Sequence, residues 1–424
     1  MTAASLSVAI IGAGPAGAYV AERLVRKNPA AQIDVIDRLP TPFGLIRYGV
    51  APDHQGTKNI ERVLSRAFTK GDVQFWGGLK VGADLSLADI QANYDAVVLA
   101  VGAPQDRRLG IAGEDLAGVY GSAAFVGWYN RHPDHFDLPV DLSAAGNAII
   151  IGAGNVALDV ARVLAKTPAE LSGSDVPPDV SRQLQSAPWE RIRVVGRRGI
   201  EMARFGVVEL DEMTRLAAAA AKVEAADLEG AEIADRALAE VWARMATAAS
   251  TGRPVVRFQF CWRPEAIIGS AGRVTAVRFR RQQQGPDGAY FDAEETVEQA
   301  ADLVVSCIGY AAETCDQLHP AKGHFLNTDG RISTALYTVG WAADGPTGTI
   351  ATNRPKSHAV ADRILAEVTA GTRSGRAYLT KVAQQNRASV TDFAGWQAID
   401  AAERAAAPAD RVRLKQLPNT IASL

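Results

Sequence analysis

The chain contains the same glycine-rich segment twice, and this repeat limits the folds that it can adopt. Residues 10–21 read IIGAGPAGAYVA, and residues 150–161 read IIGAGNVALDVA, 140 positions later. In each copy a short β-branched run leads into the glycines, and a stretch of helical periodicity follows. Strand, tight turn and helix in this order predict the start of a parallel βαβ unit, so we expect two such units.

Each copy carries the fingerprint of a dinucleotide-binding turn. A shift of 140 positions aligns the small residues of the two turns, namely Gly12, Gly14 and Gly17 with Gly152, Gly154 and Ala157. The first glycine permits the bend, and the second lets the backbone approach a pyrophosphate. The third small residue lets the helix pack closely on its strand, and alanine is an allowed variant there. Two dinucleotide sites are therefore predicted.

The strand that follows the first turn ends in an acidic residue, and the strand that follows the second ends in basic residues. Asp37 closes the first, 25 residues after Gly12, near the spacing at which a carboxylate binds an adenosine ribose. The second ends in Arg197 and Arg198, whose planar guanidinium groups suit a 2′-phosphate. This difference favours FAD in the first site and NADPH in the second. The alternative for the two arginines is a solvated basic end of a strand.

Length, charge and cysteine content exclude several classes of protein. With 424 residues the chain is expected to form at least two domains. A net charge of -2 argues against a nucleic-acid binder that relies on its overall charge. The three cysteines are too few and too scattered for a disulfide framework or a four-thiolate cluster, so no metal site is predicted and a reducing compartment is expected. Nine residues before the first IIGAG leave no room for a signal peptide, and no apolar run is long enough to span a membrane, so we expect a cytoplasmic protein.

The remaining patterns suggest how the two units are connected. Residues 75–81 and 94–103 read as further strands of the first sheet, and residues 207–249 as helix. An antiparallel meander that returns to a buried strand is expected from residues 254–264, 272–284 and 301–310. Residues 336–355 then read as strand, glycine-rich turn and helix start. The simplest topology is a discontinuous first domain with the second inserted into it.

Four stretches together resemble adrenodoxin reductase and the bacterial ferredoxin–NADP reductases similar to it: PTPFGLIRYGVAPDHQGTKN (40–59), GNVALDVAR (154–162), VGRRG (195–199) and GWAADGPTG (340–348). The resemblance implies an α/β, glutathione-reductase-like fold of two Rossmann-like domains. The FAD domain would comprise residues 1–105 and 310–424, and the inserted NADP domain residues 106–309. The implied activity passes electrons from NADPH through FAD to a ferredoxin- or adrenodoxin-type iron–sulfur protein, which feeds an acceptor such as a cytochrome P450.

The resemblance also implies which residues bind the cofactors. Around FAD it places Gly12, Gly14, Pro15, Ala16, Gly17, Asp37, Leu45, Val81, Trp341, Gly348, Thr349 and Ile350. Around NADP it places Gly152, Ala153, Gly154, Asn155, Arg197, Arg198, Glu209 and again Gly348. The stretch GPTGTI (345–350) opens a helical pattern, and a helix N-terminus there can stabilise negative charge on a flavin.

Two residues are candidates for a catalytic role. By resemblance, His54 and Asp159 lie near the contact of flavin and nicotinamide, where they would position groups or relay a proton. In the alternative, Asp159 orders its helix and His54 caps a loop. Hydride transfer itself needs no protein acid or base, so both interpretations stay open.

A ferredoxin partner is acidic, so its docking surface should be basic. The candidates are Arg26, Lys27, Arg204, Arg236 and Arg244, although each could be an ordinary solvated residue. Two other functions remain open: an NADPH-dependent reductase of a quinone or other small acceptor, and a non-catalytic sensor that binds FAD and NADPH. A dithiol reductase is disfavoured because no two of the three cysteines form a CxxC pair.

Overall fold

The computed structural model describes residues 5–248, 255–386 and 390–416. The chain divides into two compact units: Met1–Gln105 with Tyr310–Leu424, and Asp106–Gly309. These limits coincide with the domain boundaries expected from the sequence. We call them the first and the second unit. Among the described residues, no helix is long and apolar enough to cross a membrane.

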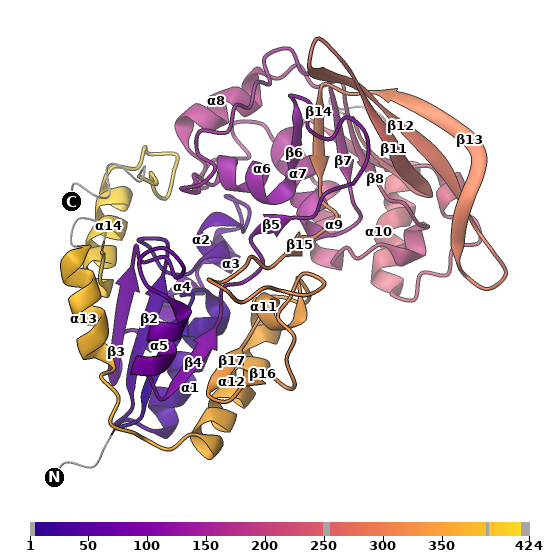
Figure 1. The fold of residues 1–424 in the computed structure, drawn as a ribbon. Coiled ribbons are helices and arrows are strands. Elements are labelled where there is room, and N and C mark those ends of the chain that lie inside the picture. Colours follow the sequence, from indigo (N-terminus) through magenta and orange to yellow (C-terminus); the bar gives the residue numbers. More distant parts are fainter. Residues whose placement is uncertain (1–4, 249–254, 387–389, 417–424) are drawn as a thin grey trace. The chain divides into compact units, whose positions relative to one another are not determined.

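The first unit is built on a six-stranded sheet in the order β16-β17-β4-β1-β2-β3 (Figure 1). All neighbouring pairs are parallel except β16 with β17. Its strands are β1 (Ser7–Ile11), β2 (Gln32–Asp37), β3 (Asp72–Gly77), β4 (Ala96–Leu99), β16 (Arg331–Ser333) and β17 (Leu336–Thr338). Because β16 and β17 come from beyond residue 310, the sheet is completed by the last quarter of the chain.

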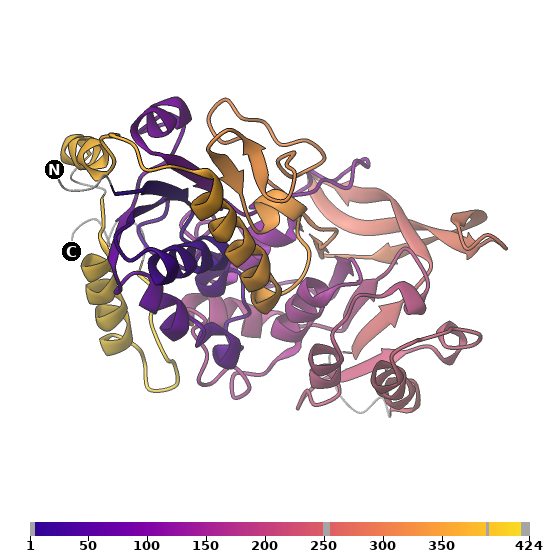
Figure 2. The same ribbon diagram turned by 90° about the horizontal axis from the view of Figure 1, so that it is seen from below.

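Both faces of this sheet are covered, which explains why β1 is apolar throughout. Val8 and Ile10 belong to a core with α1, α12 and α14, whereas Ala9 and Ile11 belong to a second core with α5 and α13. Helix α12 lies alongside α1 (Figure 2). The helices of this unit are α1 (Pro15–Lys27), α2 (Leu45–Tyr48), α3 (Gln55–Lys58), α4 (Glu61–Leu64), α5 (Leu87–Asn93), α11 (Trp341–Asp344), α12 (Ile350–Glu367), α13 (Arg376–Gln385) and α14 (Phe393–Ala405).

The second unit repeats the plan with a parallel sheet in the order β6-β14-β7-β8-β10-β9. Its strands are β6 (Val119–Gly121), β7 (Asn147–Ile151), β8 (Arg191–Val195), β9 (Ala220–Val223), β10 (Val255–Gln259) and β14 (Leu303–Ser306). Its helices are α6 (Ser122–Tyr129), α7 (Asn155–Ala165), α8 (Pro178–Ser186), α9 (Val207–Met213) and α10 (Arg236–Thr247). An antiparallel meander of β11 (Trp262–Ser270), β12 (Arg273–Gln284) and β13 (Tyr290–Ala300) covers part of one sheet face (Figure 1). Outside the two units' main sheets, β5 (Gln105–Asp106) pairs with β15 (Tyr310–Ala311).

Three expectations from the sequence were wrong in detail. The predicted helix at 207–249 contains a strand, β9, which the sheet contacts of β10 impose on an alanine-rich sequence of helical propensity. The predicted meander strand at 254–264 is two strands of different sheets, because the chain turns at Cys261, whose φ is 60°. The predicted strand at 75–81 ends at Gly77, so Val81 lies in the loop beyond β3.

Candidate functional site

The first glycine turn connects β1 to α1 and can accept no side chain at two of its three glycines. A Cβ on Gly12, whose φ is 112°, would lie 2.3 Å from the Ala100 carbonyl oxygen. One on Gly17 would lie 2.1 Å from the Gly12 oxygen. At Gly14, by contrast, nothing lies within 4 Å. The chain itself therefore needs Gly12 and Gly17, whereas the space beside Gly14 is open to a ligand.

The helix that follows this turn begins without a side-chain cap. Gly14 is the N-cap residue, Pro15 occupies the first turn, and no side chain accepts from the first-turn N–H groups of α1. Uncapped N–H groups at a helix N-terminus form a binding site for an anion. The geometry around Gly14 thus fits the pyrophosphate of a dinucleotide.

Asp37 lies at the end of β2 beside the turn. Its carboxylate accepts from the Ala13 N–H at 2.7 Å and from the Leu39 N–H at 2.9 Å. Burial raises the pKa of Asp37, and these two N–H donors oppose that rise. The two bonds fix the carboxylate at the carboxyl end of the sheet, where its remaining lone pairs can accept from a ribose hydroxyl.

The second part of the first unit brings the GWAADGPTG motif to the same turn. A Cβ on Gly340 would lie 2.8 Å from the Cβ of Ala16, so the two backbones are in close contact. Trp341 follows at the start of α11, half-buried, and its ring stacks on Tyr310 with centroids 5.8 Å apart. Its Nε1 donates to the Thr347 carbonyl at 3.1 Å. Trp341 is thus a fixed ring at this edge of the sheet.

The predicted helix start at residues 348–350 is present. Thr349 is the N-cap of α12 and forms a capping box with Thr352. Gly348 has a φ of 76°, and a Cβ there would lie 2.2 Å from the Thr352 Oγ1, so this position tolerates only glycine. Ile350 is the first helical residue. The capping box uses one first-turn N–H of α12, and Pro15 removes one from α1, so neither helix start has all of its first-turn N–H groups free.

Three further predicted residues of the first unit lie on short elements after the strands. Leu45 opens α2 and is 45% exposed, so its apolar side chain is accessible to a ligand. Val81 packs against one of the sheet cores. His54 is the N-cap residue of α3, and its backbone N–H donates to the Ala51 carbonyl.

The second turn reproduces the first. A Cβ on Gly152, whose φ is 144°, would lie 2.4 Å from the Cys307 carbonyl oxygen, and nothing lies within 4 Å of one on Gly154. Gly154 is the N-cap of α7, which again has no side-chain cap. Ala157 is fully buried in the third position of the turn. This site therefore has the same open N-terminus for a pyrophosphate.

The arginines after β8 are free to bind an anion. Arg197 is exposed and Arg198 half-buried, and within the described part of the chain neither guanidinium makes an ion pair or a hydrogen bond. The Asn155 Oδ1 accepts from the Gly206 N–H at 2.7 Å. Glu209 lies in the first turn of α9 with its carboxylate against Gly206. Asn155 and Glu209 are therefore brought together beside the turn.

Arg204, a predicted docking residue, also contacts the second turn through its backbone. Its N–H donates to the Ala153 carbonyl at 2.8 Å, and it pairs with Gly154 in a β-bridge. Its side chain is exposed. The only signal in the sequence was its position seven residues after Arg197, which does not reveal a contact with the turn.

Asp159 is engaged in an ion pair. Its Oδ1 accepts from the Arg162 Nη2 at 2.9 Å, one helical turn along α7, and the buried Arg162 also lies 3.3 Å from Glu212 on α9. The carboxylate thus balances a buried cation that joins two helices. This arrangement supports the interpretation in which Asp159 orders its helix.

The predicted docking residues differ in how far their charges are matched. Arg236 pairs with Glu240 at 3.1 Å, and Arg244 pairs with Asp211. Arg26 and Lys27 are exposed in the last turn of α1, in the other unit. Their positive charges are therefore placed at a helix C-terminus.

None of the three thiols has the environment of a redox cysteine. Cys261, Cys307 and Cys315 are all free. Burial raises the pKa of each thiol, in the case of Cys315 to about 11. A reactive thiolate needs a lowered pKa, so a dithiol mechanism has no support in these residues.

The chain matches the family model of the pyridine nucleotide-disulphide oxidoreductases over residues 6–343. It is 38% identical over 384 residues to a probable mitochondrial NADPH:adrenodoxin oxidoreductase of Schizosaccharomyces pombe, covering 84% of this chain and 81% of that protein. It is 33% identical to the NADPH-ferredoxin reductase FprA of Mycobacterium leprae, with 97% and 96% covered. The structure of Mycobacterium tuberculosis FprA in complex with NADPH matches with a TM-score of 0.94 at 32% identity, over 99% of both chains.

Proposed function

The chain belongs to the pyridine nucleotide-disulphide oxidoreductases, among the adrenodoxin and ferredoxin reductases of that family, and we propose that it passes electrons from NADPH through FAD to a ferredoxin-type iron–sulfur protein. The observation that carries this proposal is the contrast between the two strand ends. One holds an anchored carboxylate, Asp37, and the other holds Arg197 and Arg198, whose guanidinium groups are unpaired within the described ranges of the chain. A carboxylate at one site favours a cofactor with a free ribose 2′-hydroxyl, and arginines at the other favour a cofactor with a 2′-phosphate.

The first unit is proposed to hold FAD. Bound FAD supplies the chemistry that accepts a hydride and gives up electrons one at a time. The N-terminus of α1, with Gly14, Pro15 and Ala16, binds the pyrophosphate, and Asp37 accepts a hydrogen bond from the ribose. The flavin ring is bordered by Leu45, Val81, Trp341, Gly348, Thr349 and Ile350.

The second unit is proposed to hold NADPH. The N-terminus of α7, from Gly152 to Asn155, binds the pyrophosphate, and Arg197 and Arg198 bind the 2′-phosphate. Glu209 orients Asn155 and the turn from its position against Gly206. Gly348 of the first unit is the proposed neighbour of the nicotinamide.

His54 and Asp159 are proposed as positioning residues. Asp159 keeps the buried Arg162 neutralised, so that α7 presents its N-terminus in a fixed orientation. His54, at the start of α3, holds the loop that follows the exposed Leu45. If either residue relays a proton, its substitution will change the pH profile of flavin reduction as well as its rate.

The iron–sulfur partner is proposed to dock on basic residues. The candidates are Arg26 and Lys27 of the first unit and Arg204, Arg236 and Arg244 of the second; the side chain of Arg204 is exposed although its backbone N–H contacts the second turn. The partner would deliver its electrons to an acceptor such as a cytochrome P450. A reducing compartment such as the cytoplasm is proposed because all three cysteines are free thiols.

The proposed function is tested with the FAD-loaded protein. NADPH added without oxygen should bleach the flavin absorbance rapidly, whereas a non-catalytic sensor would keep its flavin oxidised. NADPH-dependent reduction of cytochrome c should then require an added ferredoxin. Equal rates with and without every ferredoxin tried, or with a quinone alone, would instead identify a reductase of small acceptors.

A further inference from the structure

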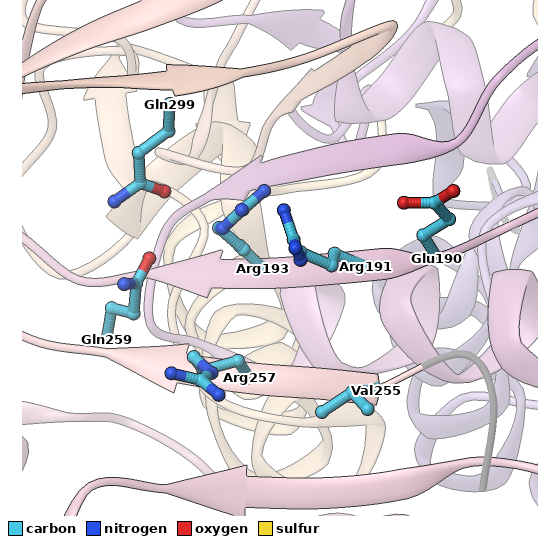
Figure 3. A pocket seen from close by; sticks show the side chains of 7 residues that line it. All are labelled: Glu190, Arg191, Arg193, Val255, Arg257, Gln259 and Gln299. Carbon is cyan, nitrogen blue, oxygen red and sulfur yellow. The ribbon is translucent and has the colours of Figure 1, made fainter.

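The second unit contains a pocket of about 560 Å³ that the proposed function does not use. It lies on one face of the parallel sheet, along β8 and β10, and not at the carboxyl ends of the strands where the second glycine turn lies. Seven residues line it: Glu190, Arg191, Arg193, Val255, Arg257, Gln259 and Gln299 (Figure 3). Three of them are arginines.

The strand register explains why the arginines share one face. Side chains alternate along β8, so Arg191 and Arg193 lie on the face of Val195, which packs under the meander. The register of the parallel pair places Arg193 beside Arg257 of β10. Strands of a parallel sheet are usually apolar on both faces, so charged residues at alternate positions mark a part of the face that no helix covers.

The positive charge in this pocket is only partly matched. Arg257 pairs with Glu224 at 2.7 Å. The guanidinium of Arg191 has no ion-pair or hydrogen-bond partner in the part of the chain that the structure describes. Among the same residues, the guanidinium of the half-buried Arg193 donates only to the Ala300 carbonyl, at 3.5 Å. Burial lowers the pKa of Arg193, and the neighbouring Arg191 and Arg257 lower it further, so an anion would relieve a repulsion already present.

Two amide side chains supply a second, independent observation. The Oε1 atoms of Gln259 and Gln299 are buried and have no hydrogen-bond partner among the residues that the structure describes. They come from β10 and β13, and Figure 3 shows both amides extending toward the pocket from opposite sides. A buried acceptor without a donor is destabilising, and hydroxyl groups of a ligand would supply the missing donors.

We propose that this pocket binds a phosphorylated sugar, either free or as part of a nucleotide. Arg191, Arg193 and Arg257 bind the phosphate, since guanidinium groups match phosphate oxygens in charge and geometry. Gln259 and Gln299 accept hydrogen bonds from the sugar hydroxyls. The pocket has the volume of a small-molecule site, and its occupancy does not require the reductase activity proposed above.

The test is calorimetric titration of the FAD-loaded protein with ribose 5-phosphate in the absence of NADP⁺, whose own phosphorylated riboses would compete for the pocket. One molecule should bind per chain, and Arg193→Ala and Arg191→Ala should each weaken binding about tenfold or more. Gln299→Ala should lower the affinity for ribose 5-phosphate but leave the affinity for inorganic phosphate unchanged. Tighter binding of adenosine monophosphate than of ribose 5-phosphate identifies a nucleotide ligand, and the reverse order a sugar phosphate.

Two controls separate this pocket from other phosphate sites. Arg278→Ala removes an arginine that pairs with Glu298 on the meander, outside the pocket, and should leave binding unchanged. Arg197→Ala with Arg198→Ala should also retain it. No measurable binding at millimolar ribose 5-phosphate would overturn the proposal, as would full affinity in the Arg193→Ala protein. The flavin absorbance spectrum and the rate of flavin reduction by NADPH, expected to be unchanged in Arg193→Ala, verify that this variant is folded.

Discussion

The two glycine turns share a backbone plan and differ in the side chains placed around it. In both, the first glycine donates to the strand beside it, Gly12 to Ile36 and Gly152 to Val195. In both, a third strand closes the back of the turn, through the carbonyl of Ala100 in one and of Cys307 in the other.

In each unit a later segment of the chain also donates a backbone hydrogen bond to the second residue of the turn. Phe43 donates to the Ala13 carbonyl at 2.9 Å, and Arg204 donates to the Ala153 carbonyl at 2.8 Å. The donating residue is a buried phenylalanine in the first unit and an exposed arginine in the second. The shared backbone thus fits what the two proposed cofactors have in common, the pyrophosphate, and the side chains that differ around it fit what distinguishes them.

The largest expected effect concerns the strand ends. Arg197→Ala with Arg198→Ala should reduce the ratio of kcat/KM for NADPH over NADH about 100- to 1000-fold, because two charge-assisted hydrogen bonds to the 2′-phosphate are lost. Steady-state kinetics with both nucleotides measures this ratio. Arg278→Ala, which alters an ion pair on the meander, should not change it. An unchanged preference in the double variant would mean that the 2′-phosphate binds elsewhere.

The next effect separates glycines that the fold needs from glycines that the ligand needs. Gly12→Ala should destabilise the first unit by about 3 kcal/mol, since it combines a positive φ with a clash against Ala100, and FAD should be lost. Gly14→Ala meets no protein atom, so the melting temperature of the FAD-free protein should change by about 2 °C or less while FAD binding weakens. Thermal melting and flavin stoichiometry measure both.

The substitution in the second turn that corresponds to Gly14→Ala should move the effect to the other cofactor. Gly154→Ala should weaken NADPH binding and leave the FAD content unchanged. If Gly14→Ala retains FAD at full affinity, the open space beside Gly14 is not where its pyrophosphate binds.

A smaller effect is expected at Asp37. Asp37→Ala removes the acceptor of the Ala13 and Leu39 N–H groups together with the proposed ribose contact, so FAD should bind about tenfold more weakly. Fluorescence titration of the FAD-free protein with FAD measures the affinity. Asp37→Glu, which keeps the carboxylate, should restore most of it. Equal affinity in Asp37→Ala would remove this residue from the site.

The smallest effect is expected where the backs of the two turns differ. Cys307→Ala places an alanine behind the second turn, as Ala100 lies behind the first. The rate of flavin reduction by NADPH should then change less than about twofold. Burial raises the pKa of Cys307, so its thiol is not a nucleophile at neutral pH. Stopped-flow absorbance measures the rate. A tenfold loss without a change in melting temperature would restore a role for the thiol.

The sequence predicted those parts of the fold that depend on residues close to one another in the chain. The two strand–turn–helix segments were predicted because the glycines, the apolar runs and the helical period lie within about 20 residues of one another. Strand β9 was missed because Ala220–Val223 has helical propensity, and only its pairing with β10 makes it a strand.

The candidate sites were predictable to the same extent. The spacing of Gly12 and Asp37 indicates their proximity, because both follow adjacent parallel strands. The contacts of Gly340 with Ala16 and of Arg204 with Ala153 join segments that no local pattern relates. The arginine pocket did have a signal, the alternation in RIRVV, which departs from the continuous apolar run of a strand buried on both faces.

The packing of α12 against α1 sets an order of events during synthesis. The second unit, residues 106–309, is contiguous in the chain and can fold as soon as it leaves the ribosome. The first unit cannot, because β17 and α12 must be made before its sheet and the cover of α1 are complete. At ordinary translation rates this is a delay on the order of tens of seconds. For that period the emerging N-terminal segment leaves the apolar side of α1 exposed, so this segment is where a chaperone would be needed.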